Sequence, residues 1–592
     1  MIKRLAPVGL MLAVACGGGD NGGTGPVTPP SDISSMAVGD VRVLNPADIT
    51  NGIDLPAGSG ARDYVIVVGN TALAKDAEVS FVVKADKSTG ADFGVSAPSD
   101  LGGRSNILVG QIPLARTRQQ AVENRVRNFE RRGLGMKSAP GLFGGSRLSV
   151  RRSAQAAAMA VPVVGEIINL NIPDANTDNL CENFFQTQAE VASVSTRAIL
   201  AVDTRDGPPA ALFTSAQMDS ITTEFDNVTY PTAAAYFNNP TDIDGNGRVI
   251  ILFSGRINEL SPPGTQGGFV GGFFFAGDFF PPTDTPQAQG CASTNRAEIF
   301  YLLAPDPTGR WGNVRTTGSV RQGIRGTIAH EFQHMINAGN RFENPNANAF
   351  EANWLDEGLA HFSEDAVGRV ARGFGDLETL DFAKLVPCNT PCREANDFNA
   401  FFFQNLARLT YWMQEPSKFS PVSKMADTSL AVRGAAWAML RYAADNYSST
   451  APRALTRALV AGPDTGLKNF TAAVKVPYDT VIAGWLVSMF ADHFGISGLN
   501  SKYQYASYNF RSVMGPVARS VLGNQTIVYP LTVTPIGTGS DSFSATNRSG
   551  TGTYYRLIVA AGAAAKNVKV LDASGTNPAT FTGLHVYVLR VQ

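Results

Sequence analysis

The segment His330-Glu331-Phe332-Gln333-His334 governs how the rest of this sequence is interpreted. Two imidazoles at positions i and i+4 lie on one face of a helix, one turn apart, and can bind a single metal ion. Glu331 lies beside them, rotated by about 100° from His330, where it can act as a base without being a ligand. The pattern is the HExxH motif of zinc hydrolases. It predicts Zn²⁺ bound by His330 and His334, with Glu331 as the general base.

The surrounding residues predict the helix that this motif needs. Within residues 323–337, apolar side chains recur at helical spacing and form one stripe, whereas the two histidines lie on a different face. Gly339 is expected to end this helix. A His-Glu pair can also do no more than cap or salt-bridge a helix, so the motif gains weight only if a further metal ligand is found.

A catalytic zinc ion needs a third protein ligand and an open position for water. The Gly and His that follow the motif in a metzincin are absent, because residues 337 and 340 are both Asn. The third ligand must therefore come from another part of the chain. A second predicted helix begins in residues 353–364, which read Asn-Trp-Leu-Asp-Glu-Gly-Leu-Ala-His-Phe-Ser-Glu.

This second segment resembles the Trp-Leu-Asn-Glu-Gly-Phe-Ala segment of the gluzincins, such as aminopeptidase N. Residues 242–247, 330–337 and 354–364 together resemble the hyicolysin family of bacterial neutral metallopeptidases. The resemblance implies a zinc metallopeptidase whose core combines a mixed-sheet subdomain with a helical subdomain. It also implies that Glu357 is the third ligand and that Glu364 orients a ligating histidine through its free ring N–H.

Other side chains could share this site. His361 is one turn from Glu357 and could compete as a ligand or line the site, and Glu351 is a weaker rival. The negative charge that develops on the scissile carbonyl oxygen also needs a donor besides the metal. Arg433, Tyr442 and His361 are the candidates, and the sequence does not choose between them.

The motifs predict an endopeptidase that hydrolyses peptide bonds of extracellular proteins with metal-activated water. An aminopeptidase is an alternative, because the Trp-Leu-x-Glu-Gly segment also occurs in aminopeptidases. The lack of a Gly-x-Met-x-Asn segment, which would hold a substrate amine, favours the endopeptidase. A surface binding or adhesion lipoprotein with a structural or inactive zinc site is the other alternative. The intact Glu331 argues against it, because a closed structural site needs no base.

Residues 1–16 predict export. They combine a positive start, an apolar run too short to span a bilayer and small residues before Cys16. This resembles a bacterial lipoprotein signal and implies that Cys16 becomes the lipidated N-terminus, followed by a flexible tether over 17–33. We therefore expect a membrane-anchored or secreted protein of the bacterial cell envelope. Ordinary secretion, with Cys16 discarded, is the alternative.

The other cysteines number four, which suits two disulfides in an exported chain. Among the three possible pairings we favour the local pair and the remaining long-range pair. These are Cys388–Cys392 and Cys181–Cys291.

Composition excludes one class of partner. The chain has 592 residues, with 49 Lys and Arg against 50 Asp and Glu. This balance creates no field that would attract nucleic acid, and no nucleic-acid recognition motif is visible.

The length predicts several domains in an α+β arrangement. Short alternating apolar runs between Gly, Pro and Asp clusters predict two β-sandwiches, one at each end of the catalytic core. Within the core, residues 198–202, 249–253 and 298–303 read as buried strands, whereas 318–500 is mostly helical. The predicted units are an N-terminal sandwich over 34–115, a catalytic domain over 160–504 and a C-terminal sandwich over 505–592.

Residues 116–159 differ from their surroundings because arginine is concentrated there. One interpretation is a solvated helix and basic linker. The other is a pro-segment that is removed by cleavage among the arginines.

Two further segments carry weaker hypotheses. Asp242, Asp244 and Asn246 match the first half of a calcium loop, although Phe253 stands where the acidic twelfth residue belongs. They predict either a Ca²⁺ site or a plain Asp-Gly turn. Residues 264–282 are rich in Phe and Gly and could form a flap or edge strand for an extended substrate, or a buried hairpin.

Overall fold

The computed structural model describes residues 32–73, 76–87, 118–133, 160–264, 269–285, 289–344, 346–347, 349–423, 429–537 and 542–592. The side chains of residues 129–133 are outside this description, as are the predicted signal peptide, Cys16 and the tether up to residue 31. The described chain is an α+β protein with three sheets.

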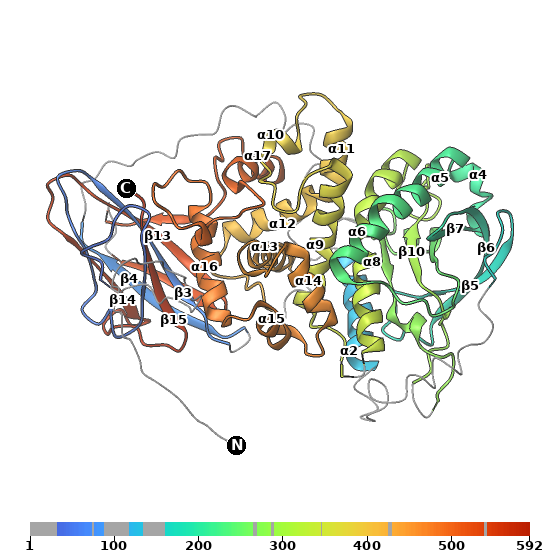
Figure 1. Ribbon diagram of the computed structural model, residues 1–592, viewed down its shortest axis with the longest axis horizontal. Helices are drawn as coiled ribbons and strands as arrows, with labels where there is room; N and C mark the ends of the chain where they lie inside the picture. The colour runs from blue at the N-terminus through green and yellow to red at the C-terminus, as the bar shows by residue number, and fades with distance from the viewer. Residues whose placement is uncertain are drawn as a thin grey trace, which may run out of the picture.

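Two of the sheets form one β-sandwich from both ends of the chain. Its strands are β1 (Val41–Leu44), β2 (Ile53–Leu55), β3 (Arg62–Asn70), β4 (Glu78–Ala85), β11 (Val533–Pro535), β12 (Ser542–Arg548), β13 (Thr551–Val559), β14 (Lys566–Asp572) and β15 (Leu584–Arg590). One sheet has the order β1-β15-β3-β13-β11 and the other β12-β4-β14-β2. Figure 1 shows the early and late strands interleaved at one end of the molecule.

The prediction of two separate sandwiches is therefore wrong. Strand β3 lies between β15 and β13, so that Val67 is in register with both Tyr587 and Tyr554. The predicted strands themselves are present. Alternation of apolar and polar residues identifies a strand, but it does not say which other strand will pair with it.

The start of the C-terminal sandwich also differs from the prediction. Helix α17 (Phe510–Leu522) occupies part of the range assigned to it and packs on α12 (Phe403–Gln414). The late strands begin only at Val533.

The third sheet has six strands in the order β5-β6-β7-β8-β10-β9. These are β5 (Ile167–Pro173), β6 (Phe184–Val194), β7 (Ala198–Asp203), β8 (Val249–Ser254), β10 (Ile299–Leu303) and β9 (Gly272–Phe274). β7, β8 and β10 run parallel, and they match the three strands predicted for this region. β9 pairs antiparallel with β10 and lies at the edge of the sheet.

Helices make up most of the remaining described chain, and the long ones lie between the six-stranded sheet and the sandwich (Figure 1). Besides α12 and α17, they are α2 (Arg118–Gly133), α4 (Pro209–Leu212), α5 (Ser215–Glu224), α6 (Tyr230–Phe237), α7 (Gly255–Glu259), α8 (Thr317–Glu343), α9 (Asn353–Arg372), α10 (Phe382–Leu385), α11 (Arg393–Phe401), α13 (Leu430–Tyr447), α14 (Pro452–Ala461), α15 (Gly466–Val474) and α16 (Tyr478–Ala491). Within the described part of the chain, no helix combines the length and the hydropathy that a bilayer span requires.

Helix α8 carries the HExxH segment and is longer than predicted. It begins after the cap residue Thr316, whose side chain accepts a hydrogen bond from the Ser319 N–H at 3.1 Å. Gly339 does not end the helix. A Cβ there would lie 2.7 Å from the Thr241 side chain, so this glycine instead lets α8 approach the loop before β8.

Helix α9 packs against α8 on one side and against α13 on another. Gly358 permits the second contact, because a Cβ there would lie 2.6 Å from Leu440 on α13. These close approaches bring polar residues of three helices together in the interior.

Candidate metal centre

The two histidines of the HExxH segment point at one another from α8. Their Nε2 atoms are 3.1 Å apart, and both side chains are buried. The 3.6-residue period of the helix places positions 330 and 334 on one face, as the motif predicts.

Glu357 reaches the same point from α9. Its Oε2 lies 3.6 Å from His330 Nε2, and the ligand atoms of His330, His334 and Glu357 all lie within 4.8 Å of one another. Both carboxylate oxygens of Glu357 are buried and accept no hydrogen bond from the described residues; Oε2 forms ion pairs with Arg433, at 3.0 Å, and with His330, at 3.6 Å. A buried carboxylate left so poorly satisfied is costly, and a cation at this position would satisfy it.

Carboxylates hold both histidines from behind. His330 Nδ1 is 2.7 Å from Glu364 Oε1, and His334 Nδ1 is 2.8 Å from Asp356 Oδ2. Each carboxylate favours a proton on the Nδ1 that faces it, which leaves Nε2 for a metal ion. Glu364 therefore lies where an orienting group was expected, and Asp356 does the same for the second imidazole.

The charges at this point favour a cation. Although burial opposes protonation, the neighbouring carboxylates of Glu357 and Glu364 raise the pKa of His330 to about 10. Burial also opposes ionisation of Glu357, but Arg433 and the histidines hold its pKa well below the usual range. A proton or a metal ion can supply the positive charge, and the two compete for the same nitrogen.

Glu331 lies beside the histidines and is held by the edge strand. The Phe274 N–H of β9 donates to its Oε2 at 2.9 Å. Burial raises the pKa of Glu331 to about 8, against the opposing charges of His330 and Arg127. A carboxylate with a raised pKa is suited to taking and returning a proton near neutral pH.

The structure brings His361 and Arg433 to this centre as well. His361 Nδ1 is 3.0 Å from Glu364 Oε1, and its ring centroid is 4.7 Å from that of His330. Burial and the nearby Arg408 lower the pKa of His361 to about 3, which keeps the ring neutral. A second set of possible ligand atoms, from His330, His361 and Glu364, also lies within 4.8 Å.

Two other candidates lie away from the histidines. The Tyr442 hydroxyl donates to the Lys502 carbonyl at 2.6 Å, and the residue is about 14 Å further along α13 than Arg433, at 1.5 Å per residue. Glu351 accepts from the Gly466 N–H at 2.6 Å and pairs with Arg341. The structure therefore does not bring either side chain to the two histidines, and of the three candidate donors only Arg433 and His361 lie there.

Sequence reasoning missed the contribution of α2. Glu123 pairs with Arg433, and its ligand atom lies within 4.8 Å of those of His330 and Glu331. Arg127 lies 4.0 Å from Glu331 Oε2. The predicted solvated helix is thus buried at the centre of the molecule. The sequence signal that could have indicated this role was Glu123, an acidic residue within a stretch rich in arginine.

The loop before β8 gathers acidic side chains. Asp242, Asp244 and Glu298 place one oxygen each within 4.8 Å of one another. Glu298 precedes β10, the parallel neighbour of β8, which explains why a search along one loop missed it. Asn246 instead donates to Asp244 at 2.6 Å. Whether Ca²⁺ binds here stays a prediction.

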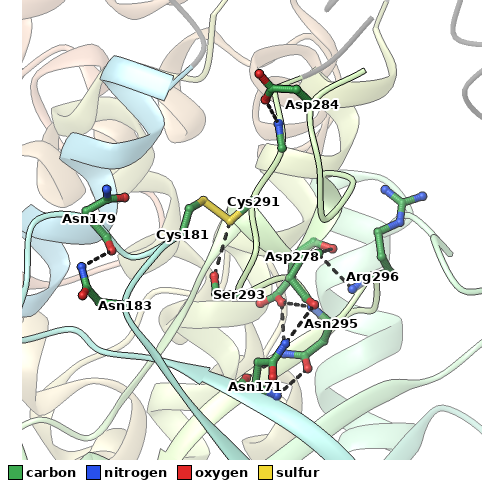
Figure 2. The surroundings of a disulfide bond; sticks show 12 residues. Asn171, Asn179, Cys181, Asn183, Asp278, Asp284, Cys291, Ser293, Asn295 and Arg296 are labelled. Carbon is green, nitrogen blue, oxygen red and sulfur yellow. Dashed lines mark hydrogen bonds between the residues drawn. A yellow bond between two sulfur atoms is a disulfide. The ribbon is translucent and has the colours of Figure 1, made fainter. Parts of the chain in front are cut away.

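Both favoured disulfides are present, as Cys181–Cys291 and Cys388–Cys392. Figure 2 shows that the first lies beside a polar cluster around Asp278. The Asn295 N–H donates to Asp278 at 2.7 Å and the Tyr301 hydroxyl at 2.8 Å. Burial nevertheless raises the pKa of Asp278 to about 7.

A cavity of about 430 Å³ lies between α5, α8 and α11, lined by Glu224, Arg325 and their neighbours. None of the candidate metal ligands lines it. The cavity therefore has no part in the centre described above.

Comparison with known proteins gives one partial likeness. No family model matches the chain. Over 151 residues, 26% of its length, the chain is 31% identical to the neutral metalloprotease ShpI of Staphylococcus hyicus. The matched region spans about a third (31%) of that protein. Over this region, the chain is similar to a neutral metalloprotease.

Proposed function

We propose that this protein is a zinc-dependent endopeptidase of the gluzincin type, related to the hyicolysin family, that acts on extracellular proteins. The convergence of His330, His334 and Glu357 within 4.8 Å carries the proposal. Two imidazoles and one carboxylate are a ligand set of catalytic zinc sites. The partial likeness to a neutral metalloprotease supports the same reaction class.

The residues at the centre fit a bound zinc ion. Glu357 is buried with oxygens that accept no hydrogen bond from the described residues, and His330 Nε2 and His334 Nε2 face the same point. When bound, zinc acidifies a water molecule and polarises the scissile carbonyl. Glu364 and Asp356 orient the two imidazoles through their Nδ1 atoms.

Glu331 is the proposed base. Its carboxylate takes the proton of the attacking water and later places it on the leaving amine. The hydrogen bond from Phe274 N–H fixes the position of Oε2. Arg433 and His361 are the remaining candidates for a donor to the carbonyl oxygen, since both lie beside the metal ligands.

The other parts of the proposal rest on the sequence. Lipidation at Cys16 would anchor the protein to a membrane of the cell envelope, with secretion as the alternative. The two disulfides suit an oxidising compartment.

The deciding experiment compares Glu331→Gln and Glu357→Gln with the parent protein. We expect the parent to bind one zinc ion and to hydrolyse casein until a chelator is added. Glu331→Gln should keep the zinc and lose activity by a factor of about 10² to 10⁴, because the base is gone and the ligands are not. Glu357→Gln should lose zinc. Bound metal is measured by atomic emission on purified protein.

The same measurements discriminate the alternatives. If His361→Ala abolishes zinc binding and Glu357→Gln does not, the ligand set is His330, His361 and Glu364. Full activity in zinc-bound Glu331→Gln would refute the assigned base. Zinc without hydrolysis in the parent, both before and after limited trypsin treatment, would point to a binding protein. Release of single N-terminal residues from peptides would point to an aminopeptidase.

A further inference from the structure

Helix α2 covers the proposed catalytic residues. It lies beside α8 in the middle of the molecule, far along the fold from the strands that precede it in the sequence (Figure 1). Glu331 is only 2% exposed and Glu123 only 4%. A peptide bond must reach Glu331 and the metal position to be cleaved, and α2 places Glu123 and Arg127 beside them.

The side chain of Gln119 takes up main-chain groups at the edge of the sheet. Its Oε1 accepts from the Gly271 N–H at 2.8 Å, and its Nε2 donates to the Gly272 carbonyl at 2.9 Å. An extended peptide bound to the free edge of β9 would use these groups. The Gln119 amide therefore stands in for the amide of a peptide.

Glu123 follows one turn later on the same face of α2. Gln119 Nε2 donates to its Oε1 at 2.7 Å, and Arg433 donates to its Oε2. The carboxylate lies within 4.8 Å of the ligand atoms of His330 and Glu331, where water and a scissile carbonyl would have to sit. It also engages Arg433, a candidate donor to that carbonyl.

We propose that α2 is an inhibitory segment of the peptidase proposed above, a role that rests on that function. Gln119 occupies the substrate position on β9, and Glu123 occupies the position of the reacting groups. In this position α2 limits the activity on protein substrates, and its removal or displacement raises that activity.

The interleaved sandwich determines what can be removed. Strands β1–β4 precede α2 but share two sheets with β12–β15. A cut on each side of α2, among residues 86–117 and 134–159, would release the helix and leave the sandwich paired. Both ranges contain arginines at which a trypsin-like protease could hydrolyse the chain, including Arg104, Arg116, Arg147 and Arg151.

The test uses the full chain with zinc bound. A peptide hydroxamate serves as the probe, because its hydroxamate chelates zinc while its peptide part needs the substrate position. Its affinity is measured by calorimetry, and hydrolysis of a quenched fluorescent peptide is measured in parallel, before and after limited trypsin treatment. Mass spectrometry identifies the fragments that remain. The double variant Gln119→Ala/Glu123→Ala is compared with a control variant, Glu182→Gln. Glu182 is an exposed residue just before β6.

Removal of residues 118–133 should raise probe affinity and hydrolysis at least tenfold. The double variant should show a similar rise without any cut, and Glu182→Gln should behave like the parent. Equal probe affinity and equal hydrolysis in all zinc-bound forms would overturn the inhibitory role alone. Absence of zinc, or of hydrolysis in every form, would overturn the proposed function and the inhibitory role with it.

Discussion

Among single residues, the orientation of the two histidines depends on carboxylates that contact their Nδ1 atoms and lie away from the proposed metal position. Asp356 lies 2.8 Å from His334 Nδ1, and its other oxygen accepts from Asn337 at 2.6 Å. Burial opposes its ionisation, yet His334 lowers the pKa of Asp356. The charge of Asp356 thus makes the His334 imidazole more basic.

Asp356→Asn should lower zinc affinity about 10- to 100-fold while leaving all three ligands in place. The amide can still accept from His334 but carries no charge. Zinc affinity is measured by competition with a chromophoric chelator. Asp54→Asn, on the exposed side of β2, is the matched control. If both variants bound zinc equally well, Asp356 would have no positioning role.

Asp278 is the residue whose ionisation should affect stability most clearly. Its pKa in the folded protein is about 7, above the ordinary value near 4. Between about pH 4 and 7, the folded state therefore holds a proton that the unfolded state has lost. Stability should fall as pH rises through this window, by about 1.4 kcal/mol for each pH unit spanned.

Asp278→Asn should remove that part of the pH dependence, because an amide does not titrate. The urea midpoint of the parent protein should fall more between pH 5 and pH 8 than that of the variant. Glu298 and Asp244, with pKa values of about 7 and about 6, contribute in the same direction in both proteins. Parallel pH profiles would show that Asp278 is ionised throughout.

At the scale of elements, a short edge strand positions the proposed base. The Phe274 N–H of β9 donates a hydrogen bond to Glu331. Further along the chain, Cys291 forms a disulfide with Cys181. Five of the six Phe side chains in residues 269–280 are buried, and Phe269 is 41% exposed. The burial of these Phe side chains agrees with the buried hairpin, one of the two hypotheses for this segment. The other hypothesis needs an edge strand, and β9 is one.

The Cys181–Cys291 disulfide should stabilise this region more than Cys388–Cys392 stabilises its own. The first closes a loop of 110 residues and the second a loop of four. Cys181→Ala/Cys291→Ala should cost about 3–5 kcal/mol in urea unfolding, because loop-closure entropy grows with loop length. The other pair of alanines should cost less. An equal or smaller loss for the long loop would contradict the expectation.

At the scale of the whole molecule, the two ends of the chain depend on each other. β3 is buried on both faces, and its neighbours in the sheet are β15 and β13 from the C-terminus. Alternate residues, such as Ile66 and Val65, belong to two different hydrophobic cores. The sandwich therefore closes only when the last strands have been made.

A chain that ends at residue 530 should fail to form the sandwich. Without β13 and β15, the apolar faces of β3 have no partners. We expect loss of amide hydrogen-exchange protection in residues 62–70 and aggregation of the truncated protein. Retained protection there would mean that β1–β4 form a sandwich alone, as the sequence had predicted.

From the residues alone, the HExxH helix, the start of the helix at Asn353 and strands β7, β8 and β10 could be predicted. Local spacing sets these features, because a helix places positions 330 and 334 on one face in any fold. The sequence also favoured the two disulfide pairings that the structure contains. The choice of Glu357 as a ligand came from a resemblance and stays a prediction; the structure places its carboxylate within 4.8 Å of the ligand atoms of His330 and His334.

Which distant segments meet depends on tertiary packing. In the structure, strands from both ends of the chain pair, and Glu298 lies beside Asp242. Tyr442 lies away from the histidines, and Arg127 of α2 contacts Glu331. Periodicity records which face of an element is buried and carries no information about the partner that buries it. Packing between elements, which is non-local, makes that choice.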